Sequence, residues 1–346
     1  MSDLVCVGSL NVDLVTYVPA FPLPGETVAG TSFQQGAGGK GANQAAAAAR
    51  LCGAGERVRM VGAVGDDALG RDYLDPTGVF AGSGVDCAGV ATIRGVSTGV
   101  APIFVNAAGE NCIVVVPGAN GRVDAALVDA ALRGGGGGAA VGGVLVQLEV
   151  PQAATLAALR AAAALRAPAF FTPAPAPPAG LADDAFFALT SVLIPNEGEA
   201  RALLPGGDAA LPLADVAARL AARGARAVVV TRGAAGALVV CPPHAPVAVP
   251  APTVRAVVDT TGAGDCFSGS LAFFYARLAP PAEAGAPDAA VAVDFDALVE
   301  AARRAVVVAA HSVARKGAQS SYAARAELPA ALFNYAARPA ALPTEV

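Results

Sequence analysis

The stretch Asp259-Thr-Thr-Gly-Ala-Gly-Asp265 lies between an apolar run and a segment that favours a helix. Gly262 and Gly264 free the backbone to turn sharply, so successive N–H groups can point at one spot. The first amides of a following helix and the positive end of its dipole attract an anion, above all a phosphate. The stretch therefore predicts an anion hole and, in Asp265, a carboxylate that accepts a proton from a hydroxyl. The alternative is a glycine turn with Asp265 as a helix cap.

Composition restricts the class of protein. The 346 residues are enough for one large domain or two small ones, and 55% of them are hydrophobic. No apolar run reaches the roughly 18 residues of a membrane helix, and the N-terminus lacks the basic region of a secretion signal. The net charge is −5 without a basic stripe, which argues against nucleic acid as a partner. Six scattered cysteines form no metal or disulfide pattern, so we expect a cytoplasmic protein.

Short apolar strands alternate with helical segments along most of the chain. The strands are expected at 4–8, 57–64, 144–148, 169–172, 191–194, 226–230 and 236–240. Helices are expected at 45–51, 124–132 and 151–165, after 265, and at 297–311, with Asp296 as the cap of the last. This order predicts an α/β fold with a mostly parallel sheet covered by helices. Two β-rich segments, 15–33 and 98–116, predict a small separate sheet.

Polar side chains follow several of the expected strands, where open α/β sheets bind their ligands. They are Asn11, Asp13, Glu149, Asn196, Glu199 and Thr231. Asn11 and Asp13 share one side of an extended segment and could bind a polyol, although turn residues would look the same.

A second glycine-rich stretch runs from Gly36 to Gln44 and opens a helix. It satisfies G-x-G-x-x-G, but no apolar strand precedes it, which argues against a dinucleotide-binding dehydrogenase. A Walker A loop is also excluded, because Gln34 and Gly41 stand where glycine and serine or threonine are needed. The remaining interpretation is a loop that lets backbone approach a ligand, with Lys40 as a cation and Asn43 facing outward.

An ordered set of motifs resembles the PfkB/ribokinase family of carbohydrate kinases over nearly the whole chain. The main ones are Gly8-Ser-Leu-Asn-Val-Asp13, Gly38-Gly-Lys-Gly-Ala-Asn-Gln44, Asn196-x-x-Glu199, Thr231-x-Gly233 and the 259–265 stretch. The segments 97–101, 118–120, 147–149 and 315–319 also match. The resemblance implies one kinase domain over 1–346, a Rossmann-like three-layer sandwich. A small β-sheet lid would be formed by about 15–35 and 97–118, and it would pair two subunits.

The activity implied by the resemblance is ATP-dependent phosphorylation of D-ribose at its 5-hydroxyl, with Mg²⁺ and K⁺. Asp265 corresponds to the catalytic base, and the amides of Gly262, Ala263, Gly264 and Asp265 to the anion hole. The sugar-binding positions are Asn11, Asp13, Gly39, Lys40, Asn43 and Glu149. Those for the nucleotide and its Mg²⁺ are Asn196, Glu199, Thr231, Gly233 and Gly264. The potassium site corresponds to Asp259, Thr261, Ser312, Gly317 and Ser321.

Three segments depart from the family pattern: Asp75-Pro76-Thr-Gly78, the glycine run 134–138 and an insertion at 280–296. None of them touches a motif. Two alternatives remain open, namely a kinase for another sugar or nucleoside, such as fructose or adenosine, and a sugar- or nucleotide-binding protein without activity.

Overall fold

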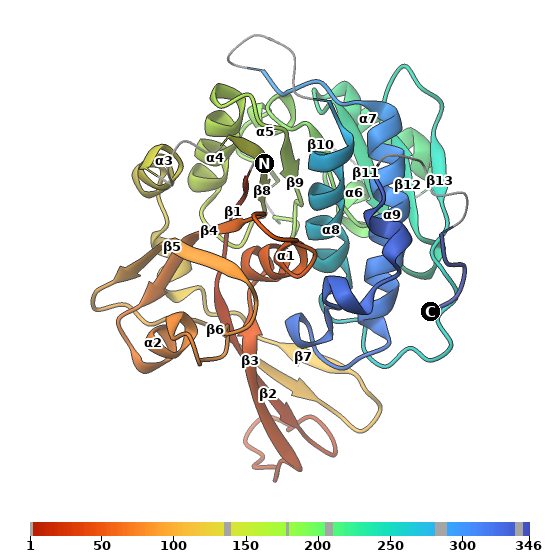
Figure 1. Cartoon of the computed structure of the whole chain (residues 1–346). Helices are drawn as coiled ribbons and strands as arrows, with labels where there is room; N and C mark the ends of the chain where they lie inside the picture. The colour runs from red at the N-terminus through yellow and green to blue at the C-terminus, as the bar shows by residue number, and fades with distance from the viewer. Residues whose placement is uncertain (1–2, 135–139, 178–179, 205–209, 281–288, 336–341) are drawn as a thin grey trace.

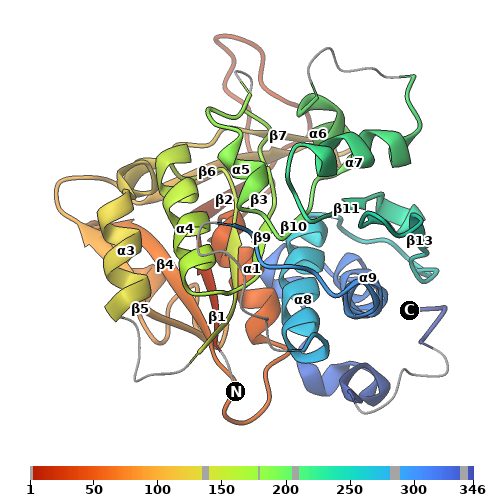
Figure 2. The same ribbon diagram turned by 90° about the horizontal axis from the view of Figure 1, so that it is seen from above.

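The computed structural model describes residues 3–134, 140–177, 180–204, 210–280, 289–335 and 342–346. Within these ranges, a nine-stranded sheet is covered by helices on both faces, and a four-stranded sheet lies beyond the carboxyl end of its strand β1 (Figures 1 and 2). This arrangement confirms the predicted three-layer α/β fold with a small additional sheet. In the same ranges, every helix falls short of the length and apolarity needed to span a bilayer.

The large sheet has the strand order β13-β12-β11-β10-β9-β8-β1-β4-β5. Neighbours are parallel except at β12, which runs antiparallel to both β11 and β13. The strands are β1 Asp3–Val7, β4 Val58–Gly65, β5 Val85–Ile93, β8 Val141–Val146, β9 Ala169–Phe171, β10 Val192–Leu193, β11 Ala227–Thr231, β12 Ala237–Val240 and β13 Val247–Val249. The predicted strand positions agree with β1, β4 and β8 to β12.

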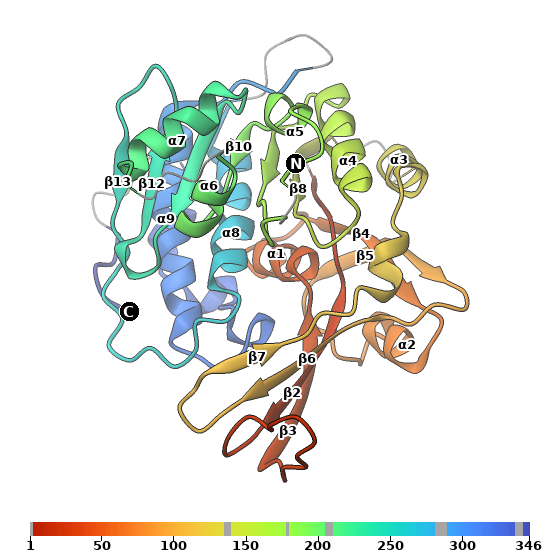
Figure 3. The same cartoon turned by 180° about the vertical axis from the view of Figure 1, so that it is seen from behind.

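Both faces of this sheet are buried, which explains the continuous apolar runs of the sequence. In β1, Leu4 and Cys6 belong to one core cluster, whereas Val5 and Val7 belong to the other. The first cluster is covered by α1 Lys40–Ala49, α8 Ala263–Leu278 and α9 Phe295–Val313. The second is covered, as Figure 3 shows from behind, by α3 Ala125–Gly134, α4 Gln152–Ala164, α5 Ala185–Ala188, α6 Glu197–Ala202 and α7 Leu213–Ala222.

The small sheet is built from β2 Asn11–Tyr17, β3 Ser32–Gly38, β6 Gly99–Val105 and β7 Asn111–Ile113, in the order β3-β2-β6-β7. Strand β2 begins only a few residues after β1 ends, so Asn11 and Asp13 lie on the small sheet itself. The sheet leaves large apolar side chains exposed, among them Phe33 and Val114.

The remaining helical elements are short. They are α2 Ala68–Leu74, η1 Gly118–Arg122, η2 Gly233–Ala235, η3 Gln319–Ser321, η4 Arg325–Glu327 and η5 Ala330–Phe333. Helix α2 ends directly before the predicted break at Asp75. Residues 135–138 of the glycine run and 281–288 of the insertion lie outside the described ranges.

The last long helix is longer than the sequence predicts. Helix α9 begins at Phe295, and its cap is Asp294, whose carboxylate accepts a hydrogen bond from Ala297 N; the predicted cap Asp296 lies inside the first turn. The helix continues to Val313, so Ser312 belongs to its last turn and not to the following loop. The apolar residues before Ser312 are buried, and this packing extends the helix beyond the expected end at His311.

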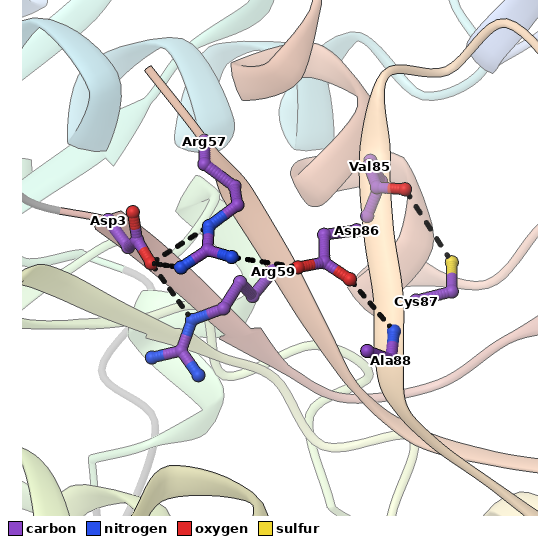
Figure 4. Close-up of polar contacts among 7 residues, drawn as sticks. All are labelled: Asp3, Arg57, Arg59, Val85, Asp86, Cys87 and Ala88. Carbon is purple, nitrogen blue, oxygen red and sulfur yellow. Dashed lines mark hydrogen bonds and ion pairs between the residues drawn. The ribbon is translucent and has the colours of Figure 1, made fainter. Parts of the chain in front are cut away.

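An ion-pair cluster joins three neighbouring strands near their amino ends, opposite the strand ends that carry the motifs (Figure 4). The carboxylate of Asp3 contacts Arg57 Nη2 at 2.6 Å and Arg59 Nε at 3.3 Å. A second carboxylate, Asp86, lies 3.4 Å from Arg57 Nη1. Asp3 and Arg59 are buried, so their charges depend on each other.

Candidate active site

The loop before α8 turns at Gly262, whose φ of 74° lies in the left-handed region that favours glycine. A side chain at this position would also collide with Tyr322, because its Cβ would lie 2.6 Å from the phenol oxygen. The Tyr322 hydroxyl donates to Gly262 O at 2.9 Å and thereby holds the turn. Asp265 follows in the first turn of α8, as predicted, and is buried.

Both carboxylate oxygens of Asp265 accept hydrogen bonds from side-chain amides of α1. Asn43 Nδ2 lies 3.0 Å from Oδ2, and Gln44 Nε2 lies 3.0 Å from Oδ1. Burial raises the pKa of Asp265 above its usual range, while the Lys40 charge and the two amides act in the opposite direction. Asp265 is therefore a buried carboxylate whose environment partly compensates the cost of its charge.

A second carboxylate, Glu149, connects the glycine loop to β8. Its Oε2 accepts hydrogen bonds from Ser9 Oγ at 2.6 Å and from the backbone N–H of Lys40 at 2.9 Å. The charge of Asp265 raises the pKa of the Lys40 ammonium, and Glu149 adds to this effect. Lys40 is thus the cation that faces the acidic groups of the site.

Asp13 is the third acidic group of the site. Burial raises the pKa of Asp13 to about 7, and the charges of Glu149 and Asp265 add to the shift. Its neighbour Asn11 is held in place by Asn120, whose Nδ2 donates to Asn11 Oδ1 at 2.8 Å. One polar cluster thus surrounds Asp265 and includes Asp13, Lys40, Asn43 and Glu149.

The glycine loop passes very close to the start of β2. Gly39 has a φ of 89°, and a Cβ there would lie 2.7 Å from Asn11 N. A larger residue would therefore push β2 and α1 apart, which explains the glycine at this predicted sugar-binding position.

A cavity of about 650 Å³ lies beside the N-terminus of α8. Its walls are largely apolar and include Val257, Phe267, Val306 and Ala310, while Thr231 and Gly233 supply polar and backbone groups. A smaller cavity of about 150 Å³ adjoins it and is lined by Lys40, Glu199 and Asp265, among others. The two cavities share Asn196, Thr231 and Gly264. The two cavities together thus form a large apolar space that adjoins a small polar one at Lys40 and Asp265.

Asn196 and Glu199 hold each other at the start of α6. Asn196 Oδ1 accepts from Glu199 N at 2.8 Å, and Glu199 Oε2 accepts from Asn196 N at 2.9 Å. This reciprocal pair is a capping box, so both residues have a local structural role as well as a place beside the small cavity. Burial raises the pKa of Glu199.

Three of the predicted cation ligands lie in one cluster. The carboxylate of Asp259 accepts hydrogen bonds at 2.9 Å from the amides of Thr261 and Gly317. Partial burial alone would raise the pKa of Asp259, but these bonds outweigh it and lower the pKa. The hydroxyls of Ser312 and Ser321 instead donate to nearby carbonyls, those of Ala309 and Ala318. Among the described residues, no cluster of three or more His, Cys, Asp or Glu side chains could hold a metal.

One amide of the predicted anion hole has a partner within the turn. Ala263 N donates to Thr260 O at 3.2 Å. Gly264 lines both cavities, and a Cβ added there would have no atom within 4 Å. The side of the turn at Gly264 is thus open toward the space in front of Asp265.

Several residues of the site were not assigned a role from the sequence. They include Gln44, Gln147, Thr172, Ser268, Gln319 and Tyr322, all of which are buried around Asp265. In the sequence, these residues could have been found only as polar side chains next to apolar runs. Gln147 follows the run Val144-Leu-Val146, and Gln44 precedes a run of alanines. The apolar wall of the large cavity, from Val257 to Val313, was also left unassigned.

Comparisons with known proteins cover nearly the whole chain. The model of the pfkB family of carbohydrate kinases matches residues 1–325. Ribokinase of Mus musculus is 37% identical over 339 residues, which cover 95% of this chain and 94% of the mouse protein.

Solved structures show the same likeness. Ribokinase from Giardia lamblia is 31% identical and has a TM-score of 0.80, with 94% of this chain and 97% of that chain covered. Ribokinase of Arabidopsis thaliana, solved in complex with ribose and ATP, is 26% identical with a TM-score of 0.77 and the same coverage. The likeness therefore extends over both the sequence and the fold.

Proposed function

The chain belongs to the pfkB family of carbohydrate kinases, and we propose that it transfers the γ-phosphate of ATP to the 5-hydroxyl of D-ribose. The observation that carries the proposal is the position of Asp265, between a polar cluster suited to a sugar and a cavity suited to a nucleotide. Similar ribokinases cover almost the full chain, and one of them was solved with ribose and ATP.

In the proposed reaction, Asp265 accepts the proton of the 5-hydroxyl as the ribose oxygen attacks the γ-phosphorus. The bond between that phosphorus and the bridging oxygen breaks, which yields ribose 5-phosphate and ADP, and the proton then leaves to solvent. Positioning and charge neutralisation supply most of the catalysis in such transfers. The open side of the turn at Gly264 and the Lys40 ammonium lie where they can attract the transferred phosphate.

The sugar would be held by side chains from the small sheet and from the main body. Asn11 and Asp13 on β2 would contribute from one side, and Lys40 and Asn43 on α1 with Glu149 after β8 from the other. Carboxylates and amides of this kind accept and donate hydrogen bonds to the hydroxyls of a polyol. The small sheet would act as the lid over the sugar.

The nucleotide would occupy the large cavity, with its base between Val257 and Val306 and its phosphates toward Gly264. A bound Mg²⁺ would supply positive charge that neutralises the phosphates. Asn196 and Glu199 border the smaller cavity and would hold the ion through water, since Asn196 Oδ1 and Glu199 Oε2 each already accept a backbone hydrogen bond.

Potassium and dimerisation are further parts of the proposal. The Asp259 carboxylate and the carbonyls of the turn at Gly317 are oxygen ligands of the type that a hard cation prefers. The exposed Phe33 and Val114 would be covered in a homodimer formed by two small sheets. The six cysteines are all free, which fits the predicted cytoplasmic location.

The decisive experiment is a panel of ribose, 2-deoxyribose, fructose and adenosine with Mg-ATP and K⁺, followed by mass measurement of each product. We expect phosphorylated ribose, formed with the highest kcat/KM of the panel. Asp265→Asn should lower kcat about 10²–10⁴-fold, the usual contribution of a general base, while ribose still binds. Asp296→Asn, outside the site, serves as the matched control. Binding of ribose and ATP without any product would favour the binding-protein alternative.

A further inference from the structure

Four side-chain amides form two arms that end on the Asp265 carboxylate. Asn43 and Gln44 donate to it directly. Behind them, Gln147 Nε2 donates to Gln44 Oε1 at 2.6 Å, and Gln319 Nε2 donates to Asn43 Oδ1 at 2.9 Å. All four amide side chains are buried. Each amide that touches Asp265 therefore has its oxygen occupied by a second amide farther away.

The hydrogen bonds in the Gln147 arm run toward Asp265, whereas Gln147 Oε1 is buried and has no hydrogen-bond partner among the described residues. The Cys6 thiol donates to a backbone carbonyl at 3.1 Å, so its sulfur is left to accept from Gln147 Nε2 at 3.5 Å. Gln44 Nε2 also donates to Thr172 Oγ1 at 3.2 Å, and the Thr172 hydroxyl donates to Ser268 Oγ at 3.2 Å. An inverted Gln44 would place its oxygen against a carboxylate oxygen of the ionised Asp265, which cannot donate.

This directionality matters for a base. An ionised carboxylate only accepts hydrogen bonds, whereas a protonated carboxyl group also needs an acceptor for its own hydrogen. Two N–H groups held against the two oxygens of Asp265 therefore favour its ionised form, against the effect of burial. An amide free to rotate could turn its oxygen toward a protonated Asp265 and stabilise that form instead.

We propose that Gln147 and Gln319 are positioning residues, which orient Gln44 and Asn43 as donors and thereby keep Asp265 ionised and aimed at the sugar hydroxyl. The role of Asp265 as the base rests on the function proposed above. Gln147 acts from the end of β8 and Gln319 from η3, so the base is oriented from two separate parts of the fold.

Other charged or titratable groups also face Asp265 and contribute to its protonation. They are Lys40 on α1, Asp13 on β2, Glu149 after β8, Glu199 on α6, Cys6 on β1, Cys266 on α8 and Tyr322 after η3. Replacing Gln147 or Gln319 by methionine alters none of these charges. The methionine side chain has nearly the same length as glutamine but lacks its N–H donors, so the variants test the orientation of the amides.

The test is the pH dependence of kcat at saturating ribose and Mg-ATP. Gln147→Met and Gln319→Met should each move the acidic limb of the profile upward by about one pH unit, a tenfold change in the protonation equilibrium. At high pH, Asp265 is ionised in every variant, so the kcat of the methionine variants should return most of the way to the wild-type value. Gln152→Met on α4, whose amide bonds only to backbone away from the site, should keep the wild-type profile.

A carboxyl-carbon NMR titration of the ligand-free protein gives a readout that does not need activity. The Asp265 signal, assigned by its loss in Asp265→Asn, should titrate at higher pH in both methionine variants. Folded variants with the wild-type titration and only a lower Tm would overturn the proposal. If Gln147→Met fails to fold, the titration of Asp265 in Gln319→Met alone tests the proposal. A wild-type protein that does not phosphorylate ribose would refute the proposed function, and the titration would still decide the role of the amides.

Discussion

Ribose binding should weaken about tenfold when the pH falls from 8 to 6, because Asp13 loses its charge over this interval. With a pKa of about 7, the Asp13 carboxylate is ionised in roughly nine-tenths of the ligand-free molecules at pH 8 and in about one-tenth at pH 6. The ionised form accepts hydrogen bonds from two sugar hydroxyls, whereas the protonated form loses part of this capacity. Burial and the charges of Glu149 and Asp265 are the cause of the shifted pKa.

Isothermal titration calorimetry with ribose at pH 6, 7 and 8 measures this dependence. At pH 7, binding should release about half a proton, which is seen by repeating the titration in buffers of different ionisation enthalpy. Asp13→Asn should bind ribose more weakly and lose the pH slope. Asp124→Asn, at the exposed start of α3, should retain it. A wild-type slope equal to that of Asp13→Asn would refute the assignment of the titration to Asp13.

The same pKa has an effect on stability with a definite sign. The folded protein binds the Asp13 proton more tightly than the unfolded chain, in which the aspartate has its ordinary pKa of 3.8. This contribution to stability is full below about pH 4 and is lost as the pH rises to about 7. Asp13→Asn should therefore raise the Tm of the ligand-free protein more at pH 8 than at pH 5, by differential scanning calorimetry.

Three further predictions concern the rest of the molecule. Replacing K⁺ by Na⁺ or tetramethylammonium at equal ionic strength should lower kcat more than ribose affinity, since a cation near Asp259 would order the turn without touching the sugar; equal kcat with all three ions would contradict this. Light scattering should give a dimer at micromolar concentration, and Phe33→Lys should shift it toward monomer; a monomeric wild type would contradict the lid interface. Asp3→Ala should cost about 3 kcal/mol in urea unfolding, because it leaves the buried Arg59 unpaired. Asp86→Ala should lower the free energy of unfolding by less than about 1 kcal/mol, because its partner Arg57 is partly exposed. Equal losses of stability in the two variants would contradict this reasoning.

The order of strands and helices could be predicted because the large sheet is buried on both faces. Its strands are short apolar runs separated by amphipathic helices, and this pattern survives in the linear sequence. The positions of Asp13, Glu149 and Asp265 followed from the polar residues that end these runs. The ordered set of motifs added the type of reaction, namely phosphoryl transfer to a sugar.

The sequence could not specify contacts between residues that are far apart along the chain. The bond from Gln319 to Asn43 spans 276 residues, and only the folded backbone brings the two amides together. The length of α9 was underestimated at both ends, since packing of its apolar face decides where it stops. Ser312 was accordingly expected in a loop, although its hydroxyl closes the last helical turn.

The placement of Asn11 and Asp13 on β2 has a consequence for how this protein could acquire a new substrate. Only three residues, 8–10, separate these side chains from β1, while Lys40 and Glu149 stand on the rigid body opposite. In the proposed complex the sugar contacts both the small sheet and the main body. How well it fits against β2 would therefore also determine how tightly the small sheet closes over the site. A change at Asn11 or Asp13 that admits another sugar therefore alters closure in the same step. Substitutions in the main body, around Glu149, would instead change the selectivity for the sugar without altering the small sheet that is proposed as the lid.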